Sequence, residues 1–484
     1  MQKKHLGRGA EEEVILFAVP VQHKDLVAPI QALLRAAAKA CTSAVGGRAV
    51  DYAAIEREIA ERTAAIESAT HASILRGLDV DAERLTIGGK PHVRIGRARG
   101  TYKTLAGSVE VERAVYRPQG VRNAPVADTI QARTGAIGRG WLPMTARAMA
   151  DDIQRSTSRD AKAGAKQKGR LPYGRMSFER VAHLVGEDWQ SEHVDIEEQL
   201  AKEYAIPEAA RSISVALDRV SVPMEEPAKR PIGRPRKNAP KRPVNRNFRM
   251  AYCGTVTLHD GDGKALNTFR RACMPEIDPN LLCGEMAAEV FHLKQNRSDL
   301  KLKLLADGAH DMWNLLEPHF PESVFGKVER GLDFYHVIEK LSPAAKAIYG
   351  NDKGAVVLRL WRHRLKSRSD AAAQILDDLQ ASGCEHKTVD SKKPVHEAIT
   401  YFEYHLERMD FAASRRTGLP IGSGGVEATA KTLVSCRMRR SGSRWKTETG
   451  EHILELRALA LSDRWDSAMD LLDATRRKSV RLAA

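Results

Sequence analysis

The sequence lacks paired cysteines. Its six cysteines are scattered through 484 residues and never form a CxxC pair, which argues against a zinc ribbon and a disulfide framework. Because unpaired cysteines are commonly buried, we expect mostly buried, reduced thiols at all six positions: Cys41, Cys253, Cys273, Cys283, Cys384 and Cys436.

Long apolar runs are also absent. The longest, residues 14–21 and 454–461, fall far short of the ~20 residues that cross a bilayer. Residues 1–13 contain no apolar region typical of a secretory signal. We therefore expect no membrane span and a cytoplasmic location.

The motifs of several enzyme classes are missing. No GxxxxGK[ST] or HExxH pattern occurs, and the GSGG run at residues 422–425 lacks the third glycine of a dinucleotide fingerprint. These absences argue against nucleotide-cofactor enzymes and zinc proteases of the HExxH type.

Positive charge, in contrast, is abundant. The chain has 77 Lys and Arg against 62 Asp and Glu, a formal net charge of +15, so its long-range field favours a polyanion such as nucleic acid. Residues 228–250 contain nine of these cations, four prolines and no acid. Within them, Arg234, Arg236 and Lys237 form a GRPRK run similar to an AT-hook, which can enter a narrow A·T minor groove. A solvated charge run is the equally open alternative.

The N-terminal part predicts helices followed by strands. Apolar spacing predicts helices over residues 24–40 and 51–78, and short strands punctuated by glycines predict a small β-meander between residues 84 and 115. The polar, basic stretch 156–174 predicts an exposed linker.

A second region alternates strands with helices. Residues 212–218 predict a strand that Pro223 and Pro227 prevent from continuing, and 248–258 with 265–274 predict a hairpin around HDGDG. A helix over 279–293, strands over 300–304 and 324–328, and an all-helical block over 337–415 complete the pattern.

Three acids are candidates for chemistry. Asp218 and Asp307 each follow a predicted strand, so they would meet at the carboxyl edge of a sheet if the strands are neighbours. Glu427 begins a predicted helix after GSGG, among basic residues. Converging carboxylates beside cations are what two-metal phosphodiester chemistry requires, although each acid alone is more often the start of a turn or of a helix.

Four motifs carry a family resemblance: VALDRVSVPMEEP around Asp218, LLADGAHDMW around Asp307, LDFYHVIEKL, and GSGGVEATAKTLVSCRMRRSGSRW around Glu427. Over roughly residues 210–460 the chain resembles bacterial insertion-sequence transposases of the ISKra group, which have an RNase H-like Asp-Asp-Glu core. The resemblance implies that Asp218, Asp307 and Glu427 bind two Mg²⁺ or Mn²⁺ ions. It also implies a [C/D]xxH motif at Asp333 and His336 that supports the site, where a hydrogen-bonded His at a helix start is the alternative.

The expected fold is α/β, an RNase H-like mixed-sheet core with an all-helical insertion, preceded by an α+β N-terminal region. The expected parts are 1–80 (helical), 81–120 (β-meander), 121–210 (helical DNA-binding or linker region), 211–336 (first part of the core), 337–415 (helical insertion), 416–470 (C-terminal part of the core) and 471–484 (frayed basic tail).

The resemblance implies a DNA transposase that cleaves at element ends and joins them to target DNA. Its partners are double-stranded DNA, both terminal inverted repeats and target, and a second copy of the chain in a homodimer or larger assembly, in a bacterial cytoplasm and at the nucleoid when bound to DNA. A noncatalytic DNA-binding protein of transposon origin and a related RNase H-like nuclease are the alternatives. The expected DNA-binding residues are Arg234, Arg236, Lys237, Lys431, Arg437, Arg439, Arg440, Arg444 and Lys446.

Overall fold

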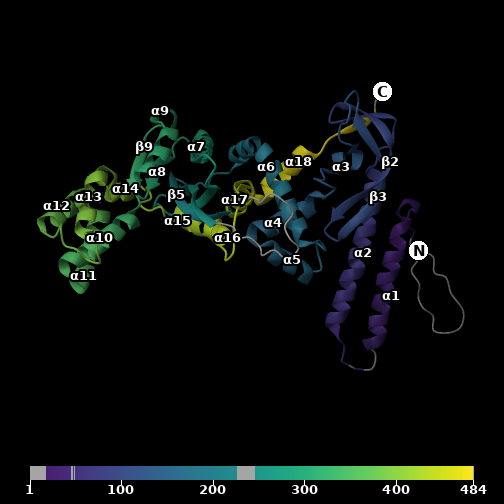
Figure 1. The fold of residues 1–484 in the computed structure, drawn as a ribbon, viewed down its shortest axis with the longest axis horizontal. Helices are drawn as coiled ribbons and strands as arrows, with labels where there is room; N and C mark the ends of the chain where they lie inside the picture. Colours follow the sequence, from purple (N-terminus) through teal and green to yellow (C-terminus); the bar gives the residue numbers. More distant parts are fainter. Residues whose placement is uncertain (1–17, 45–46, 48, 226–245, 483–484) are drawn as a thin grey trace, which may run out of the picture. The chain divides into compact units, whose positions relative to one another are not determined.

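A computed structural model describes residues 18–44, 47, 49–225 and 246–482 (Figure 1). The chain divides into two compact units, one formed by Met1–Val185 with Asp470–Ala484 and the other by Gly186–Met469. Among the described residues, no helix is long and apolar enough to cross a membrane.

The first unit combines a pair of helices with an antiparallel sheet. The helices α1 (Val27–Ala44), preceded by η1 (Val21–Leu26), and α2 (Tyr52–Leu78) agree with the predicted ranges. The sheet has the order β10-β1-β2-β3-β4. Its strands are β1 (Arg84–Ile87), β2 (Lys90–Thr104), β3 (Gly107–Pro118), β4 (Ala127–Asp128) and β10 (Val480–Leu482).

β2 is one long strand, whereas the glycines of residues 84–115 predicted only short ones. Gly100 lies inside it, opposite Val111 on β3. A Cβ at Gly100 would lie 2.1 Å from the Arg113 guanidinium, so the glycine makes room for a side chain and does not end the strand.

Two further expectations for this unit are wrong. The supposed linker 156–174 contains α5 (Ser158–Gln167), which a capping box between Thr157 and Asp160 begins. Its buried residues are Ser158, Ala161 and Ala165, small residues that a search for large apolar side chains overlooks. The supposed frayed tail 471–484 contains the end of α18 (Trp465–Arg476) and β10, which pairs with β1 because β1 would otherwise leave an open edge.

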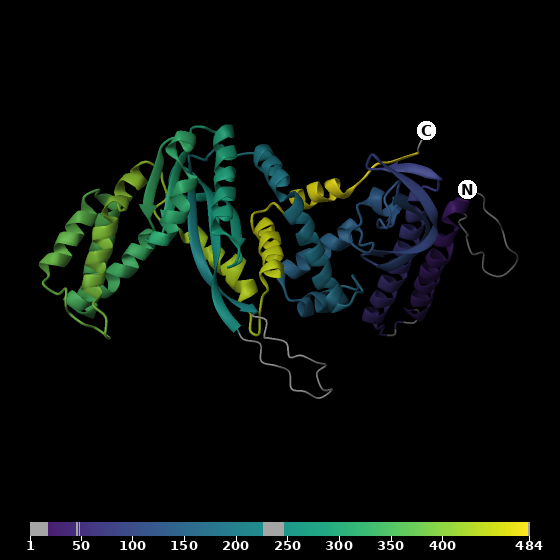
Figure 2. The same cartoon turned by 45° about the horizontal axis from the view of Figure 1, so that its top comes forward.

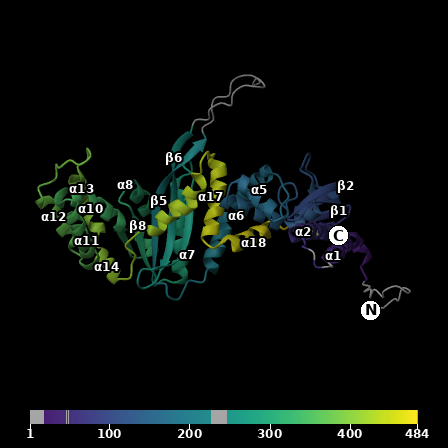
Figure 3. The same ribbon diagram turned by 90° about the horizontal axis from the view of Figure 1, so that it is seen from below.

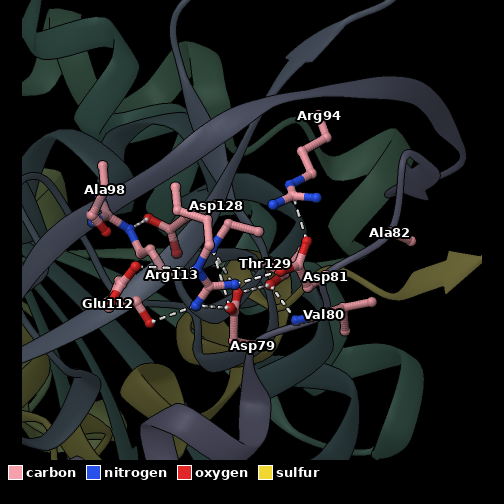
Figure 4. A network of polar contacts seen from close by, with 12 residues as sticks. Asp79, Val80, Asp81, Ala82, Arg94, Ala98, Glu112, Arg113, Asp128 and Thr129 are labelled. Carbon is pink, nitrogen blue, oxygen red and sulfur yellow. Dashed lines mark hydrogen bonds and ion pairs between the residues drawn. The ribbon is translucent and has the colours of Figure 1, made fainter.

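A polar network joins the end of α2 to this sheet (Figure 4). The Asp79 carboxylate accepts hydrogen bonds from Ala114 N at 3.1 Å and from Thr129 Oγ1 at 3.2 Å. Asp128 accepts from Tyr102 Oη and from Arg113 Nε, both at 2.9 Å. Because these carboxylates are occupied by donors of the protein, we assign them a structural role. The remaining helices here are α3 (Thr129–Thr134), α4 (Pro143–Arg155) and the first part of α6 (Arg175–Glu203).

The second unit contains the sheet β7-β6-β5-β8-β9. β5, β6 and β7 are antiparallel, whereas β8 and β9 run parallel to β5. The protein is therefore mixed α/β, and this order is compatible with an RNase H-like core. The strands are β5 (Ser212–Glu225), β6 (Arg246–His259), β7 (Ala265–Cys273), β8 (Lys301–Ala306) and β9 (Val328–Leu332).

Helices cover both faces of this sheet (Figure 3). On one face, Ile213, Val215 and Leu217 of β5 belong to the same buried core as Met286 and Val290 of α7 (Pro279–Asn296). Segments after the helical block, including α15 (Gly424–Thr429) and α17 (Thr447–Leu461), contact β6 and β7. Successive side chains of β5 point to opposite faces of the sheet, and these faces pack against different helices, so apolar and polar residues alternate along the strand.

β5 does not end at Asp218, contrary to our expectation. It runs on to Glu225 and pairs with β6 throughout, although β8 pairs with it only as far as Ala216. The extension forms a two-stranded ribbon beyond the rest of the sheet (Figures 2 and 3). Pro223 is tolerated because its missing N–H lies on the edge that β8 has left.

The strand expected at 324–328 is also displaced. Residues Glu322–Phe325 form the short helix α9, and the strand β9 begins only at Val328. Pro321 before the helix and Gly326 after it, with φ of +71°, are the usual helix-bounding residues, so the apolar residues before Gly326 belong to the helix.

Residues 337–415 are mainly helical, as predicted, with connecting segments such as 382–393 between the helices. The helical parts lie in α10 (Phe334–Tyr349), α11 (Asn351–Ser367), α12 (Ala371–Ala381), α13 (Pro394–His405), η3 (Leu406–Arg408) and α14 (Phe411–Arg416). Short segments between β8 and β9 are α8 (His310–Leu316) and η2 (Glu317–His319), and α15 is followed by the π-helical turn η4 (Ala430–Ser435) and α16 (Cys436–Met438). All six cysteines are free, but only Cys253, Cys273 and Cys283 are buried, so the expectation of mostly buried thiols holds for half of them.

Candidate active site

Asp218 and Asp307 lie at equivalent positions on two neighbouring strands. The last paired residues of β5 and β8 are Ala216 and Leu305, and each aspartate follows two residues later. Because the strands are parallel, both carboxylates lie at the same edge of the sheet. Burial raises the pKa of Asp218, and the negative charge of Asp307 acts in the same direction.

Local hydrogen bonds define the backbone at Asp307. Its carboxylate accepts from Ala309 N at 2.9 Å, an Asx turn that ends the strand. The Tyr401 hydroxyl of α13 donates to the Asp307 carbonyl at 2.9 Å. The helical block therefore contacts this edge of the sheet directly.

His336 connects the third acid to this edge. It lies on the first turn of α10, where its Nδ1 is 3.8 Å from Asp333 Oδ1 and 3.7 Å from Glu427 Oε1. The Asp333 carboxylate, aided by Asp307, raises the pKa of His336 to about 9, so the imidazole is cationic at neutral pH. The positive charge of His336 also acts to lower the pKa of Asp218. His336 therefore interacts electrostatically with Asp218 and Asp307, and it lies close to Glu427.

Asp333 is completely buried and fully hydrogen bonded. Its Oδ1 accepts from Tyr335 N at 2.6 Å and His336 N at 3.1 Å, which caps α10. Its Oδ2 accepts from the backbone N–H and the hydroxyl of Ser423. Burial alone would raise the pKa of Asp333, but His336 and these donors lower it to about 2.

The residues differ in their capacity to hold a metal. Asp333, His336 and Glu427 have ligand atoms within 4.8 Å of one another, but both oxygens of Asp333 already accept hydrogen bonds. Asp218, Asp307 and Glu427 are each partly exposed. Carboxylate oxygens are hard ligands that divalent cations prefer. A bound cation would also reduce the repulsion between neighbouring carboxylates at this edge of the sheet.

Glu427 stands at an irregular part of the chain. α15 is only six residues long and passes directly into the π-helical turn η4. Such turns are rare and occur often at functional sites because they redirect the following side chains.

The expected DNA-binding residues fall into three groups. Lys431, Arg439, Arg444 and Lys446 are exposed, and Arg440 is partly exposed. Arg437 is only 7% exposed and stacks on Trp445 at 4.8 Å from the ring centroid, so it belongs to the packing of the loop. Arg234, Arg236 and Lys237 lie outside the described residues.

Sequence reasoning missed several residues that position the site. Ser423, Tyr401 and Lys303 all hold segments around the acids. Lys303 was visible only as a polar residue alternating with leucines, a pattern typical of a solvated strand face. Its burial depends on a segment that returns from more than a hundred residues later.

Comparison with known proteins gives little. No family model and no curated protein matches the chain. Among solved structures, it is similar to the Drosophila P element transposase strand transfer complex, with a TM-score of 0.26 and 13% identity, over 71% of this chain and 83% of that chain. A similarity of this size supports no argument about function, so the case for function depends on the residues of the site.

Proposed function

We propose that the chain is a DNA transposase of the Asp-Asp-Glu type, related to the ISKra group, which cleaves DNA at element ends and transfers the freed strand into target DNA. The observation that supports the proposal is that Asp218 and Asp307 follow the parallel pairing of β5 with β8 at one edge of the sheet, while His336, which acts electrostatically on both, lies 3.7 Å from Glu427. The carboxyl edge of the strands is where open α/β sheets keep their sites, and the three acids come from positions spread over more than 200 residues of the chain.

Asp218, Asp307 and Glu427 would hold two Mg²⁺ or Mn²⁺ ions. When bound, such ions activate a water or a 3′-hydroxyl and stabilise the leaving oxygen of the phosphodiester. The partial burial of Asp218 strengthens its interaction with a cation, since the local dielectric constant is lower than in water.

The chain's own residues arrange this site. Asp333 holds the start of α10 and the start of α15 together through His336 N and Ser423. His336, at 3.7 Å from Glu427, orients that carboxylate and adds positive charge where a phosphate would approach.

The cations near α15–α17 would position the DNA backbone. Lys431, Arg439, Arg440, Arg444 and Lys446 supply charges for phosphates, and Arg234, Arg236 and Lys237 would add contacts in the minor groove. The substrates are the terminal inverted repeats and the target duplex, and joining two ends in concert requires a homodimer or a larger assembly.

The test is metal-dependent nicking of a labelled duplex carrying an element end. Asp218→Ala, Asp307→Ala and Glu427→Ala should each abolish cleavage and leave DNA affinity nearly unchanged, because these acids do not neutralise phosphates. Asp311→Ala is the matched control, since this acid lies close by in sequence but is exposed and paired with Arg219. Cleavage retained in any of the three variants refutes the assignment.

Two other outcomes identify the alternatives. DNA binding without any metal-dependent nicking by the unaltered chain indicates a noncatalytic DNA-binding protein. Cleavage that follows the shape of the DNA and ignores the element end indicates a related nuclease.

A further inference from the structure

A single segment leads from the helical block to the candidate site. Residues 414–423, here called the return segment, run from α14 to Ser423, which precedes α15. Glu427 follows within the first turn of that helix, and its N–H contacts the Ser423 carbonyl at 3.4 Å. The position of Glu427 therefore depends on how this segment is attached.

Lys303 is a deeply buried attachment of this segment. It lies in β8, four residues before Asp307, and is only 2% exposed. Its Nζ donates to Ser414 Oγ at 2.7 Å and to the Pro420 carbonyl at 2.9 Å. One ammonium group thus contacts the return segment at two separate positions.

The neighbouring strand is shaped to admit this side chain. Gly331 lies on β9, where a Cβ would stand 2.5 Å from Lys303 Cε. Burial lowers the pKa of Lys303 to about 8, although Glu329 and Asp410 oppose the shift. Burying a lysine without a hydrogen bond to a carboxylate destabilises a fold. The contacts that Lys303 makes to residues 414–420 are therefore the reason we consider for its presence.

The return segment has other attachments, including the buried Asp333 carboxylate, which accepts from Ser423 at the end of the segment. Lys301 donates to the Thr417 carbonyl at 2.8 Å from an exposed position, and Ser212 Oγ donates to the Gly418 carbonyl at 3.3 Å. Phe334 N donates to the Ile421 carbonyl at 2.9 Å. Of the two lysines of β8 that contact the segment, Lys303 is the buried one and the one that contacts it at two positions.

We infer that Lys303 is a positioning residue that sets Glu427 relative to Asp307 by anchoring residues 414–423 on β8. It does not touch the reacting atoms. The inference concerns the placement of the third acid and, for its activity measurement, rests on the proposed function.

The test uses Lys303→Met, which keeps the length of the side chain and removes the ammonium group, with Lys301→Met as the matched control on the same strand face. For Lys303→Met we expect the single-turnover cleavage rate to fall about tenfold or more, the size of effect that misplaced catalytic groups produce, with unchanged DNA affinity. Hydrogen exchange in peptides covering 414–427 should become faster, whereas β8 and β9 keep their protection. Lys301→Met, which removes only the exposed contact to Thr417, should change both measurements much less than Lys303→Met.

The outcomes separate this inference from the proposed function. Unaltered exchange in 414–427 and an unaltered cleavage rate in Lys303→Met would overturn the inference. If the unaltered chain does not cleave DNA, the proposed function fails, but the exchange measurement still decides whether Lys303 anchors the segment. If Lys303→Met does not fold, Ser414→Ala removes one of the two acceptors and should produce the same changes at smaller size; no change there would also overturn the inference.

Discussion

At the scale of single residues, Asp333 shows how one side chain can organise a site without belonging to its chemistry. Its two oxygens serve different segments, Oδ1 the start of α10 and Oδ2 the residue before α15. The resemblance placed this residue in the motif, but only its complete burial and full hydrogen bonding separate it from the acids that remain open to a cation.

Asp333→Asn tests this division of roles. Both oxygens of Asp333 accept hydrogen bonds, and an asparagine replaces one of them by an NH₂ group, which cannot accept. We therefore expect a loss of about 1–3 kcal/mol in the free energy of unfolding together with slower cleavage. Denaturant unfolding monitored by circular dichroism measures the first effect. A variant as stable as the unaltered chain would contradict the role assigned to Asp333.

At the scale of elements, strands are decided by their partners. β5 passes Asp218 without interruption because β6 accompanies it as far as Glu225, and β10 exists because β1 offers an edge. Val480 pairs with Ile87 and packs against a small core that includes Leu85 and Tyr116.

Val480→Asp should therefore destabilise the first unit. The change places a charge against Leu85 and Ile87, and burying an unpaired polar group costs on the order of 1–3 kcal/mol. Thermal unfolding of the full chain should show an earlier transition, and Arg481→Asp, at an exposed position of the same strand, is the control. Equal transitions for the two variants would show that β10 contributes nothing to the stability of this unit.

At the scale of the whole molecule, the stability of the second unit should depend on pH through buried acids on α17. Burial, with the charge of Glu451 as a second cause, raises the pKa of Glu455 to about 8. Gln190 donates to its Oε1 at 3.3 Å, whereas Oε2 has no hydrogen-bond partner. His193 and Glu285 also face this carboxyl group.

The sign of the effect follows from linkage. The folded chain holds a proton on Glu455 up to about pH 8, whereas an unfolded chain releases it near ~4.3. The stabilisation is complete below the lower value and is lost as pH rises through the upper one. Glu455→Gln imitates the protonated form, so it should match the unaltered chain at low pH and exceed its stability by on the order of 1–3 kcal/mol above pH 8.

Urea unfolding across this pH range measures the difference. Glu448→Gln, an exposed position on the same helix, should give a constant difference at every pH. A constant difference for Glu455→Gln as well would show that this carboxyl group is not held protonated in the fold.

Local pattern alone was sufficient for much of this protein. The helices at 51–78 and 279–293, the hairpin around HDGDG and the all-helical block follow from apolar period and turn residues, which act over a few positions. The three acids could likewise be named from the sequence, and Asp307 does follow a strand and Glu427 does begin a helix, although Asp218 lies inside β5. The [C/D]xxH motif was named through the family resemblance.

Only the tertiary structure decided which segments become neighbours. That Asp218 and Asp307 share a sheet edge depends on the parallel pairing of β5 with β8, and the burial of Lys303 depends on residues 414–420. Sequence patterns report the preferences of nearby residues, whereas these placements arise from the packing of segments far apart in the chain, where the burial of apolar surface and the pairing of strand edges select the partners.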